Sequence, residues 1–252
     1  MDLEQLPLSR APKPASPAVK WLVLGGIALF VASLFIFFSP ALGLVKHNFT
    51  YLPYYGPKEP VLVERDGKPV VDTIYHTVPP FRFTDQSGRP FTDRDTEGKI
   101  LVVDFFFTRC TTICPRMKVR LQQLQFKLDD KAFSDVLILS HTVDPEYDTP
   151  EVLMAHAKQL QADTSRWKFL TGDKQALYTH GADGFFLAAR EDVLADDGFL
   201  HSEQFVLVDK NKHIRGYYDG TTAEGMNALA ADLKMLLKEE KIKAKEAREA
   251  GR

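Results

Sequence analysis

The two cysteines of the chain stand four residues apart, at Cys110 and Cys114, in the stretch FTRCTTICPRMK. A thiol pair supports three kinds of chemistry: metal binding by two thiolates, a reversible redox disulfide, or a permanent structural cross-link. The usual redox spacing is CxxC, and here the loop is one residue longer. The two sulfurs can still meet as a disulfide, and the longer loop also lets both face one metal ion.

The flanking residues place the cysteines where a strand gives way to a helix. Residues 99–107 form a nearly continuous run of β-branched and aromatic residues, typical of a central strand buried on both faces. Pro115 suits the first position of a helix, and apolar residues then recur at helical spacing, at Met117, Leu121, Leu124 and Leu128. The unpaired N–H groups at the start of that helix favour thiolate, the form of cysteine that binds metals.

Strands and helices alternate through the rest of the domain. We expect two short strands within residues 81–92, further strands at 136–143, 167–170, 203–209 and 212–218, and helices at about 149–161 and 222–241. Thr149 is the expected cap of the first of these helices. This order predicts an α/β fold, a thioredoxin-like mixed sheet flanked by helices. Chemistry in that fold lies where the first core strand meets its helix, which is the position of the cysteines.

An apolar segment precedes the domain. Residues 21–38 carry no charge and are about as long as a helix that crosses a bilayer. Arg10, Lys13 and Lys20 precede the segment and only Lys46 follows closely, which predicts a cytoplasmic N-terminus. A cleaved signal peptide is the alternative, and the length of the run favours an anchor.

The chain is therefore expected to have five parts: a cytoplasmic tail (1–19), a transmembrane anchor (20–45), a linker or extension with a short hairpin (46–79), the thioredoxin-like domain (80–241) and a charged, frayed tail (242–252). We expect a single-pass protein of the bacterial inner membrane, with its C-terminal domain in the periplasm. Thiols in that compartment oxidise unless they are reduced or bound to metal.

Composition excludes two classes of protein. A net charge of −2, with 26% charged residues, gives no concentrated basic face, so a nucleic-acid partner is not expected. Two cysteines are too few for a disulfide-stapled scaffold, so the domain must fold on its hydrophobic core.

A metal site needs a ligand besides the two thiolates, and a sulfur pair with an imidazole suits copper. His201 follows the acidic loop EDVLADDG and enters a predicted strand, so it can bring an imidazole from a loop to a site on a rigid helix start. His141 lies inside a core strand, where packing is the commoner role and a role near the site is the alternative. We expect His180 to cap a helix and His213 to be exposed. The other histidines are His47, His76 and His156.

The chain resembles the SCO/SenC family of copper-binding proteins. The resemblance is carried, in order, by DFFFTRCTTICPRM, TVDPEYDTP at 142–150, WKFLTG at 167–172 and HSEQFVLVDKN from His201. It implies a thioredoxin-like domain held to a membrane by one helix, with copper, as Cu(I) or Cu(II), bound by Cys110, Cys114 and His201. Thr111 stands where the family often has proline, which removes no ligand. Leu200 and Ser202 beside the histidine also differ from the family pattern.

The same resemblance implies a metallochaperone rather than an enzyme. Its role would be delivery of copper to the dinuclear copper centre of cytochrome c oxidase, with the copper-centre subunit or another copper chaperone as partner. The main alternative is a thiol–disulfide reductase, in which Cys110 and Cys114 cycle and keep the acceptor cysteines reduced. A redox or copper sensor, a peroxidase using Thr108 and Arg109, and a purely structural disulfide are further alternatives. Asp144 and Asp148 are expected to be turn and cap residues.

Overall fold

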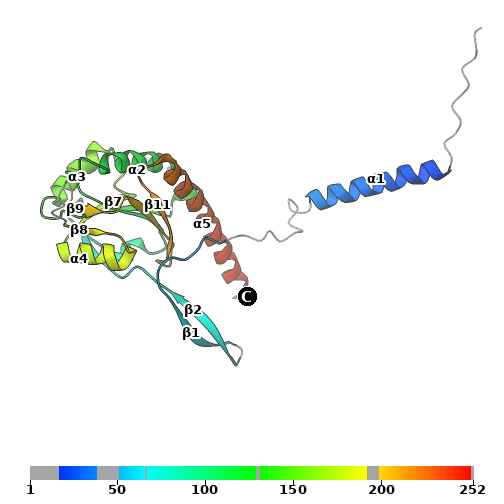
Figure 1. The fold of residues 1–252 in the computed structure, drawn as a ribbon, viewed down its shortest axis with the longest axis horizontal. Helices are drawn as coiled ribbons and strands as arrows, with labels where there is room; N and C mark the ends of the chain where they lie inside the picture. The colour runs from blue at the N-terminus through cyan, green and yellow to red at the C-terminus, as the bar shows by residue number, and fades with distance from the viewer. Residues whose placement is uncertain (1–16, 39–50, 66, 129–130, 192–198, 251–252) are drawn as a thin grey trace, which may run out of the picture. The chain divides into compact units, whose positions relative to one another are not determined.

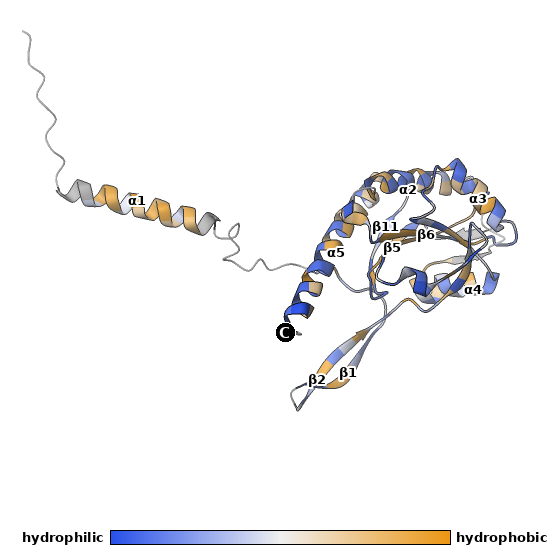
Figure 2. Ribbon diagram, turned by 180° about the vertical axis from the view of Figure 1, so that it is seen from behind, coloured by the Kyte–Doolittle hydropathy of each residue, from blue (hydrophilic) through white to orange (hydrophobic). Residues whose placement is uncertain are grey.

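The structure is a computed structural model that describes residues 17–38, 51–65, 67–128, 131–191 and 199–250. The chain divides into two compact units, residues 1–50 and residues 51–252. The first unit holds one described helix, α1 (Pro17–Phe38), whose described residues are largely hydrophobic (Figure 2). Among the described residues, no helix is both long enough and apolar enough to span a membrane. The predicted anchor, 20–45, overlaps α1, and its residues 39–45 lie outside the described part.

A seven-stranded mixed sheet forms the centre of the second unit in the part of the chain that the structure describes. Its strands are β3 (Arg82–Asp85), β4 (Pro90–Thr92), β5 (Ile100–Phe106), β6 (Val136–Thr142), β7 (Trp167–Thr171), β10 (Gln204–Val208) and β11 (Ile214–Asp219). Their order is β11-β10-β5-β6-β7-β3-β4. β5, β6 and β7 are parallel, and the strands on either side are antiparallel. The predicted mixed sheet is confirmed.

Helices cover both faces of this sheet. α2 (Cys114–Leu128), α3 (Pro150–Gln159) and α5 (Ala223–Ala250) lie over one face, and α4 (Lys174–Thr179) lies over the other (Figure 1). Short turns of helix occur at Asp93–Thr96 and Lys131–Phe133, and a π-helical turn, His180–Gly184, continues α4. Thr149 caps α3 as predicted, because its side chain accepts a hydrogen bond from the Val152 amide.

The core lies between the sheet and these helices. Every residue of β5 and β6 is buried, as expected for parallel strands covered on both faces. The helix predicted after the cysteines is also present. The four apolar residues at helical spacing are buried: Met117, Leu121, Leu124 and Leu128. The core therefore fixes the end of β5 and the start of α2, the two elements that flank the cysteines.

The segment before the domain is part of the same compact unit. β1 (Lys58–Arg65) and β2 (Lys68–Tyr75) form an antiparallel hairpin with eight residue pairs. The chain on either side of the hairpin packs on the domain: the Tyr55 amide donates to the Ile214 carbonyl at 3.0 Å, and the Val78 amide donates to the Lys212 carbonyl at 2.9 Å. A second, short hairpin pairs β8 (Ala189–Glu191) with β9 (Phe199–His201).

Three details differ from the sequence predictions. α5 continues through Ala250, so most of the tail expected to fray at 242–252 is helical. Lys243 explains part of this, because its ammonium group pairs with Glu239 one turn earlier at 2.7 Å. Helix α2 begins at Cys114, one residue before Pro115. His213 is partly buried rather than exposed, because its Nδ1 bonds the His76 carbonyl at 2.9 Å.

Candidate functional site

The cysteines lie on the loop that leaves the central strand β5 and on the first residue of α2. Both side chains are thiols and both are buried, Cys110 with 5% of its surface exposed and Cys114 with none. The Cys114 amide, at the helix start, donates to the Cys110 sulfur across 3.4 Å. The structure thus brings the two predicted site residues together, on a helix N-terminus that favours negative charge on sulfur.

The environment of Cys114 opposes that helix effect. Its hydrogen bond with Cys110 and its burial raise the pKa of the Cys114 thiol, and a backbone hydrogen bond with Phe107 lowers it by less. Cys114 is therefore protonated at neutral pH, and a thiolate forms there only when an electrophile or a metal ion displaces the proton. Two buried thiols this close fit a soft metal ion and also fit a reversible disulfide.

A buried carboxylate holds the loop that carries Cys110. Asp148, fully buried, accepts hydrogen bonds from the Thr108 amide at 3.1 Å, from the Thr108 hydroxyl, and from the Thr142 hydroxyl at 2.5 Å. Burial raises the pKa of Asp148, and the threonine hydrogen bonds limit that rise. Asp148 thus connects the residue two before Cys110 to the end of β6.

A second carboxylate fixes the next residue of the same loop. Asp144 accepts from both Nε, at 3.2 Å, and a terminal nitrogen of Arg109, the immediate neighbour of Cys110. The Arg109 guanidinium also lies 4.2 Å from the centroid of the Tyr147 ring, a cation–π contact. We call Thr108, Arg109, Asp144 and Asp148 the loop clamp. The sequence predicts turn and cap roles for Asp144 and Asp148 and does not predict this clamp. Its residues stand in two short stretches of the sequence, Thr108-Arg109 before the first cysteine and DPEYD at 144–148.

His201, the third predicted ligand, is the last residue of β9, where its backbone pairs with Ala189. Its side chain lies outside the described part of the structure, so its distance from the cysteines is not defined. The acidic loop before it, residues 192–198, also lies outside. Among the side chains that are described, no group of three or more histidine, cysteine, aspartate or glutamate residues is arranged to hold a metal ion. His201 as a ligand stays a prediction.

Comparisons with known proteins agree with this architecture. The sequence profile of the SCO1/SenC family matches residues 72–238. The chain is 32% identical over 168 residues to the SCO1 protein homolog of Bacillus subtilis (strain 168), covering 67% of this chain and 86% of that protein. BsSco, a protein of known structure, is described as a member of the Sco family of cytochrome c oxidase assembly proteins with a disulfide switch. It matches with a TM-score of 0.57 and 30% identity, over 64% of this chain and 94% of BsSco.

A further solved structure, Bradyrhizobium japonicum ScoI with copper bound, matches with a TM-score of 0.53 over 64% of this chain and 99% of ScoI. At 23% identity, that likeness establishes the fold alone.

The mixed sheet, with a dithiol where its central strand meets a helix, defines a thioredoxin-like thiol protein. The profile match and the Bacillus subtilis relative narrow the identification from this class of protein to one family. The chain belongs to the SCO1/SenC family.

Proposed function

We propose that this chain binds one copper ion through Cys110, Cys114 and His201 and delivers it to the dinuclear copper centre of a cytochrome c oxidase. The observation that carries the proposal is the pair of buried, adjacent thiols at the helix start. Thiolate sulfur selects soft metal ions, and a sulfur pair with one imidazole suits copper. Membership of the family, and the oxidase-assembly description of BsSco, support the choice of acceptor.

Each residue has a distinct task in this proposal. Cys110 and Cys114 give up their protons and supply the sulfur ligands. The loop clamp keeps the Cys110 backbone in place while the ion enters and leaves, because Thr108 and Arg109 are both tied to carboxylates. His201 supplies a third ligand from a separate hairpin, and a ligand on a separate element can be withdrawn when copper passes to the acceptor.

We also propose that the protein is anchored in the bacterial inner membrane, with the copper domain on the periplasmic side. The support is the uncharged run 21–38 and the excess of positive charge before it. Anchoring would keep the domain at the membrane surface, close to a membrane-bound acceptor or another copper chaperone. Alkaline extraction of membranes, followed by detection of the chain, tests this part separately.

Copper titration of the reduced full-length chain tests the main proposal. We expect one tightly bound Cu⁺ per chain, lost in a Cys110→Ser/Cys114→Ser variant and strongly weakened in His201→Ala. Retention of parent affinity in His201→Ala would show that the third ligand is misassigned. Absence of copper binding in the parent chain would reject the chaperone function.

A second candidate function is reduction of the acceptor's disulfide, and the difference in burial of the two sulfurs favours it. Cys110 keeps some exposed surface while Cys114 has none, as expected when the outer thiolate attacks and the inner thiol resolves. Cys110 would form a mixed disulfide with one acceptor sulfur and release the other as a thiol. Cys114 would then attack Cys110, forming a Cys110–Cys114 disulfide and a reduced acceptor, so two electrons pass from this chain to the acceptor. This reaction does not need His201, so His201→Ala separates the two functions.

A further inference from the structure

A pair of buried histidines, one in β6 and one at the end of α4, takes no part in the proposed chemistry. His141, in β6, has no exposed surface, and His180, at the C-terminal end of α4, is 7% exposed. Their ring centroids are 5.3 Å apart. Phenylalanine rings enclose the pair, with centroids between 4.9 and 6.2 Å from one or both imidazoles: Phe81, Phe83, Phe105 and Phe185.

Three ring nitrogens of this pair have no hydrogen-bond partner among the described residues: both nitrogens of His141, and Nε2 of His180. Buried polar atoms without partners are rare, because each costs about 1–3 kcal/mol, and an ion is one of the few explanations for such atoms. Phenylalanine in place of both histidines would suit the aromatic surroundings and avoid that cost. Two imidazoles in mutual contact therefore point to something that binds between them.

Both imidazoles are in the protonation state that binds metals. Burial, together with the neighbouring His180, lowers the pKa of His141 well below its usual value, and the backbone of Asp104 and Leu139 opposes this by less. Burial lowers the pKa of His180 to about 4. At neutral pH both rings are neutral, and a neutral imidazole has a lone pair for a metal ion.

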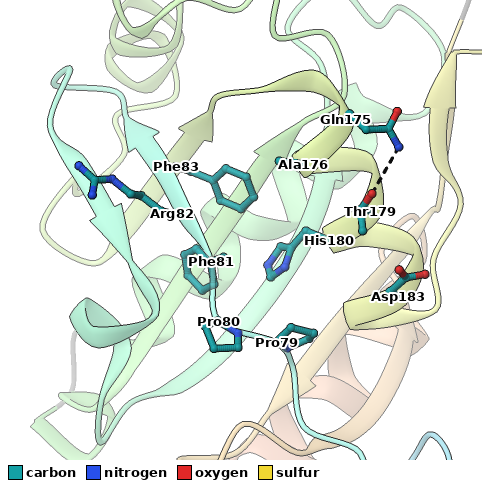
Figure 3. A pocket seen from close by; sticks show the side chains of 10 residues that line it. All are labelled: Pro79, Pro80, Phe81, Arg82, Phe83, Gln175, Ala176, Thr179, His180 and Asp183. Carbon is teal, nitrogen blue, oxygen red and sulfur yellow. Dashed lines mark hydrogen bonds between the residues drawn. The ribbon is translucent and has the colours of Figure 1, made fainter.

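A cavity open to solvent is lined by one histidine of the pair, His180. It has a volume of about 390 Å³ and lies between the segment from Pro79 to Phe83 and helix α4 with the turn that follows (Figure 3). His180 lines this cavity, and its ring points towards Phe81 and Phe83 (Figure 3). Asp183 is at the same opening. His141, which has no exposed surface, does not line the cavity and lies behind His180.

We propose that His141 and His180 form a second metal site, a two-coordinate site for a soft monovalent ion such as Cu⁺ or Ag⁺. Metal–nitrogen bonds to imidazole are about 2 Å long, so two rings bound linearly to one ion have centroids about 6 Å apart. The centroids of His141 and His180 are 5.3 Å apart, so the rings must move apart by about 1 Å to hold the ion between them.

The coordination number follows from the surroundings. Among the described residues no third histidine, cysteine or carboxylate joins the two rings, and the phenylalanines supply no lone pair. Zn²⁺ in proteins is almost always four-coordinate, whereas Cu⁺ and Ag⁺ accept two nitrogen ligands. A single positive charge also costs less to bury than a double one, and aromatic ring faces favour a cation.

The test uses the full-length chain carrying Cys110→Ser, Cys114→Ser and His201→Ala, so that the site of the proposed function is absent and its failure cannot affect the result. With histidine labelled by ¹⁵N, Ag⁺ is added without oxygen or chloride and the ring nitrogens are followed by NMR. We expect the signals of His141 and His180 to shift together and to reach their limit at one equivalent of Ag⁺. Cu⁺ should compete with Ag⁺, and Zn²⁺ should not.

His180→Phe, which fits the aromatic surroundings, should abolish this binding. The matched control is His156→Phe, because His156 is also buried, also has an unpartnered Nε2, and packs against Phe106 and Phe169. The control should bind Ag⁺ like its parent. Any of three results would overturn the proposal. The signals of both histidines could stay unmoved in the folded triple variant, Ag⁺ binding could be unchanged by His180→Phe, or Zn²⁺ could bind as well as Ag⁺.

Discussion

At the scale of single residues, the surroundings of Cys114 determine how readily its thiol loses a proton. Cys114 is buried and hydrogen-bonded to Cys110, and both effects raise the pKa of its thiol. If copper binds Cys114 as proposed, it must displace a proton that the apo protein retains at neutral pH. The charge that the thiolate gains is compensated by the metal ion rather than by solvent.

This protonation state predicts how copper binding depends on pH. We expect loading with Cu⁺ to release at least one proton per ion, so the apparent affinity rises by about tenfold per pH unit for each proton released. The affinity rises with pH because the proton and the metal ion compete for the same sulfur. Calorimetric titrations in buffers with different ionisation enthalpies measure the proton count. A titration without proton release would mean that a thiolate is already present.

The loop clamp makes a second prediction for single residues. Thr108→Val removes a hydroxyl that donates to the buried Asp148, which should lower the unfolding free energy by about 1–3 kcal/mol. Because Thr108 also positions the cysteine loop, copper affinity should fall by about 10- to 100-fold, the range for residues that orient metal ligands. Competition with a Cu⁺ chelator and urea denaturation give the two values.

The matched control is Thr77→Val, at an exposed position outside the cysteine loop. It should leave both quantities close to those of the parent. Equal effects of the two variants would contradict a specific role for the clamp.

At the scale of elements, a buried ion cluster ties three parts of the chain together. Arg215 in β11 pairs with Asp209 at 3.0 Å and with Glu239 in α5 at 2.9 Å, and all three side chains are fully buried. Its guanidinium also donates to the carbonyls of Leu52 and Pro53, which precede the first hairpin. A buried charge is stable only with its partners in place, so this cluster couples the extension, the sheet edge and the last helix.

Arg215→Met should therefore destabilise the protein by about 3–5 kcal/mol, because it leaves the buried Asp209 without its cation and Glu239 with Lys243 alone. The comparison variant is Lys245→Met, which removes the exposed pair with Glu249 in the same helix α5 and should cost less than about 0.5 kcal/mol. Urea denaturation at pH 7 measures both. Similar losses in the two variants would show that burial does not determine the strength of these pairs.

The same cluster predicts that the unfolding free energy falls in acid. Burial opposes ionisation of Glu239, but hydrogen bonds from Arg215 and Lys243 outweigh it and hold the pKa of Glu239 below 4.5. A carboxyl group with a lower pKa in the folded state stabilises the protein above the unfolded pKa, and this contribution is lost as pH falls through the folded pKa. We expect the unfolding free energy of the parent to decline below about pH 4.5, and that of Glu239→Gln to decline less. Parallel pH curves would contradict this assignment.

Sequence periodicity predicted most of these elements, because buried strands and amphipathic helices leave local patterns. β5, β6 and the apolar face of α2 are examples. Contacts between distant segments leave no such pattern, and they account for what was missed. Arg215 reads as an ordinary charged residue of a hairpin, and the partners of Thr108 and Arg109 lie about 35–40 positions away. His141 was predicted from its strand to be a packing residue, and only the fold brings it next to His180.

At the scale of the whole molecule, we propose that the independently folding part begins before residue 80. The sequence predicts a domain from residue 80, whereas the compact unit begins at residue 51. Leu52, before the hairpin, is buried, and its amide donates to Glu239 at 3.2 Å while its carbonyl accepts from Arg215. Leu52 thus belongs to the core, and the chain beside it is hydrogen-bonded to the domain.

Two truncations of the chain test this boundary. A chain of residues 51–252 should unfold in one cooperative transition, with the same midpoint in urea as the full-length protein in detergent, and should bind copper with the same stoichiometry. A chain of residues 80–252 keeps every strand of the main sheet but loses the carbonyls that Arg215 uses and the buried Leu52. It should be less stable by at least about 3 kcal/mol, and adding Arg215→Met to it should cost less than the same substitution costs in the longer chain. Equal stability of the two truncations would place the boundary at residue 80 and make the extension a true linker.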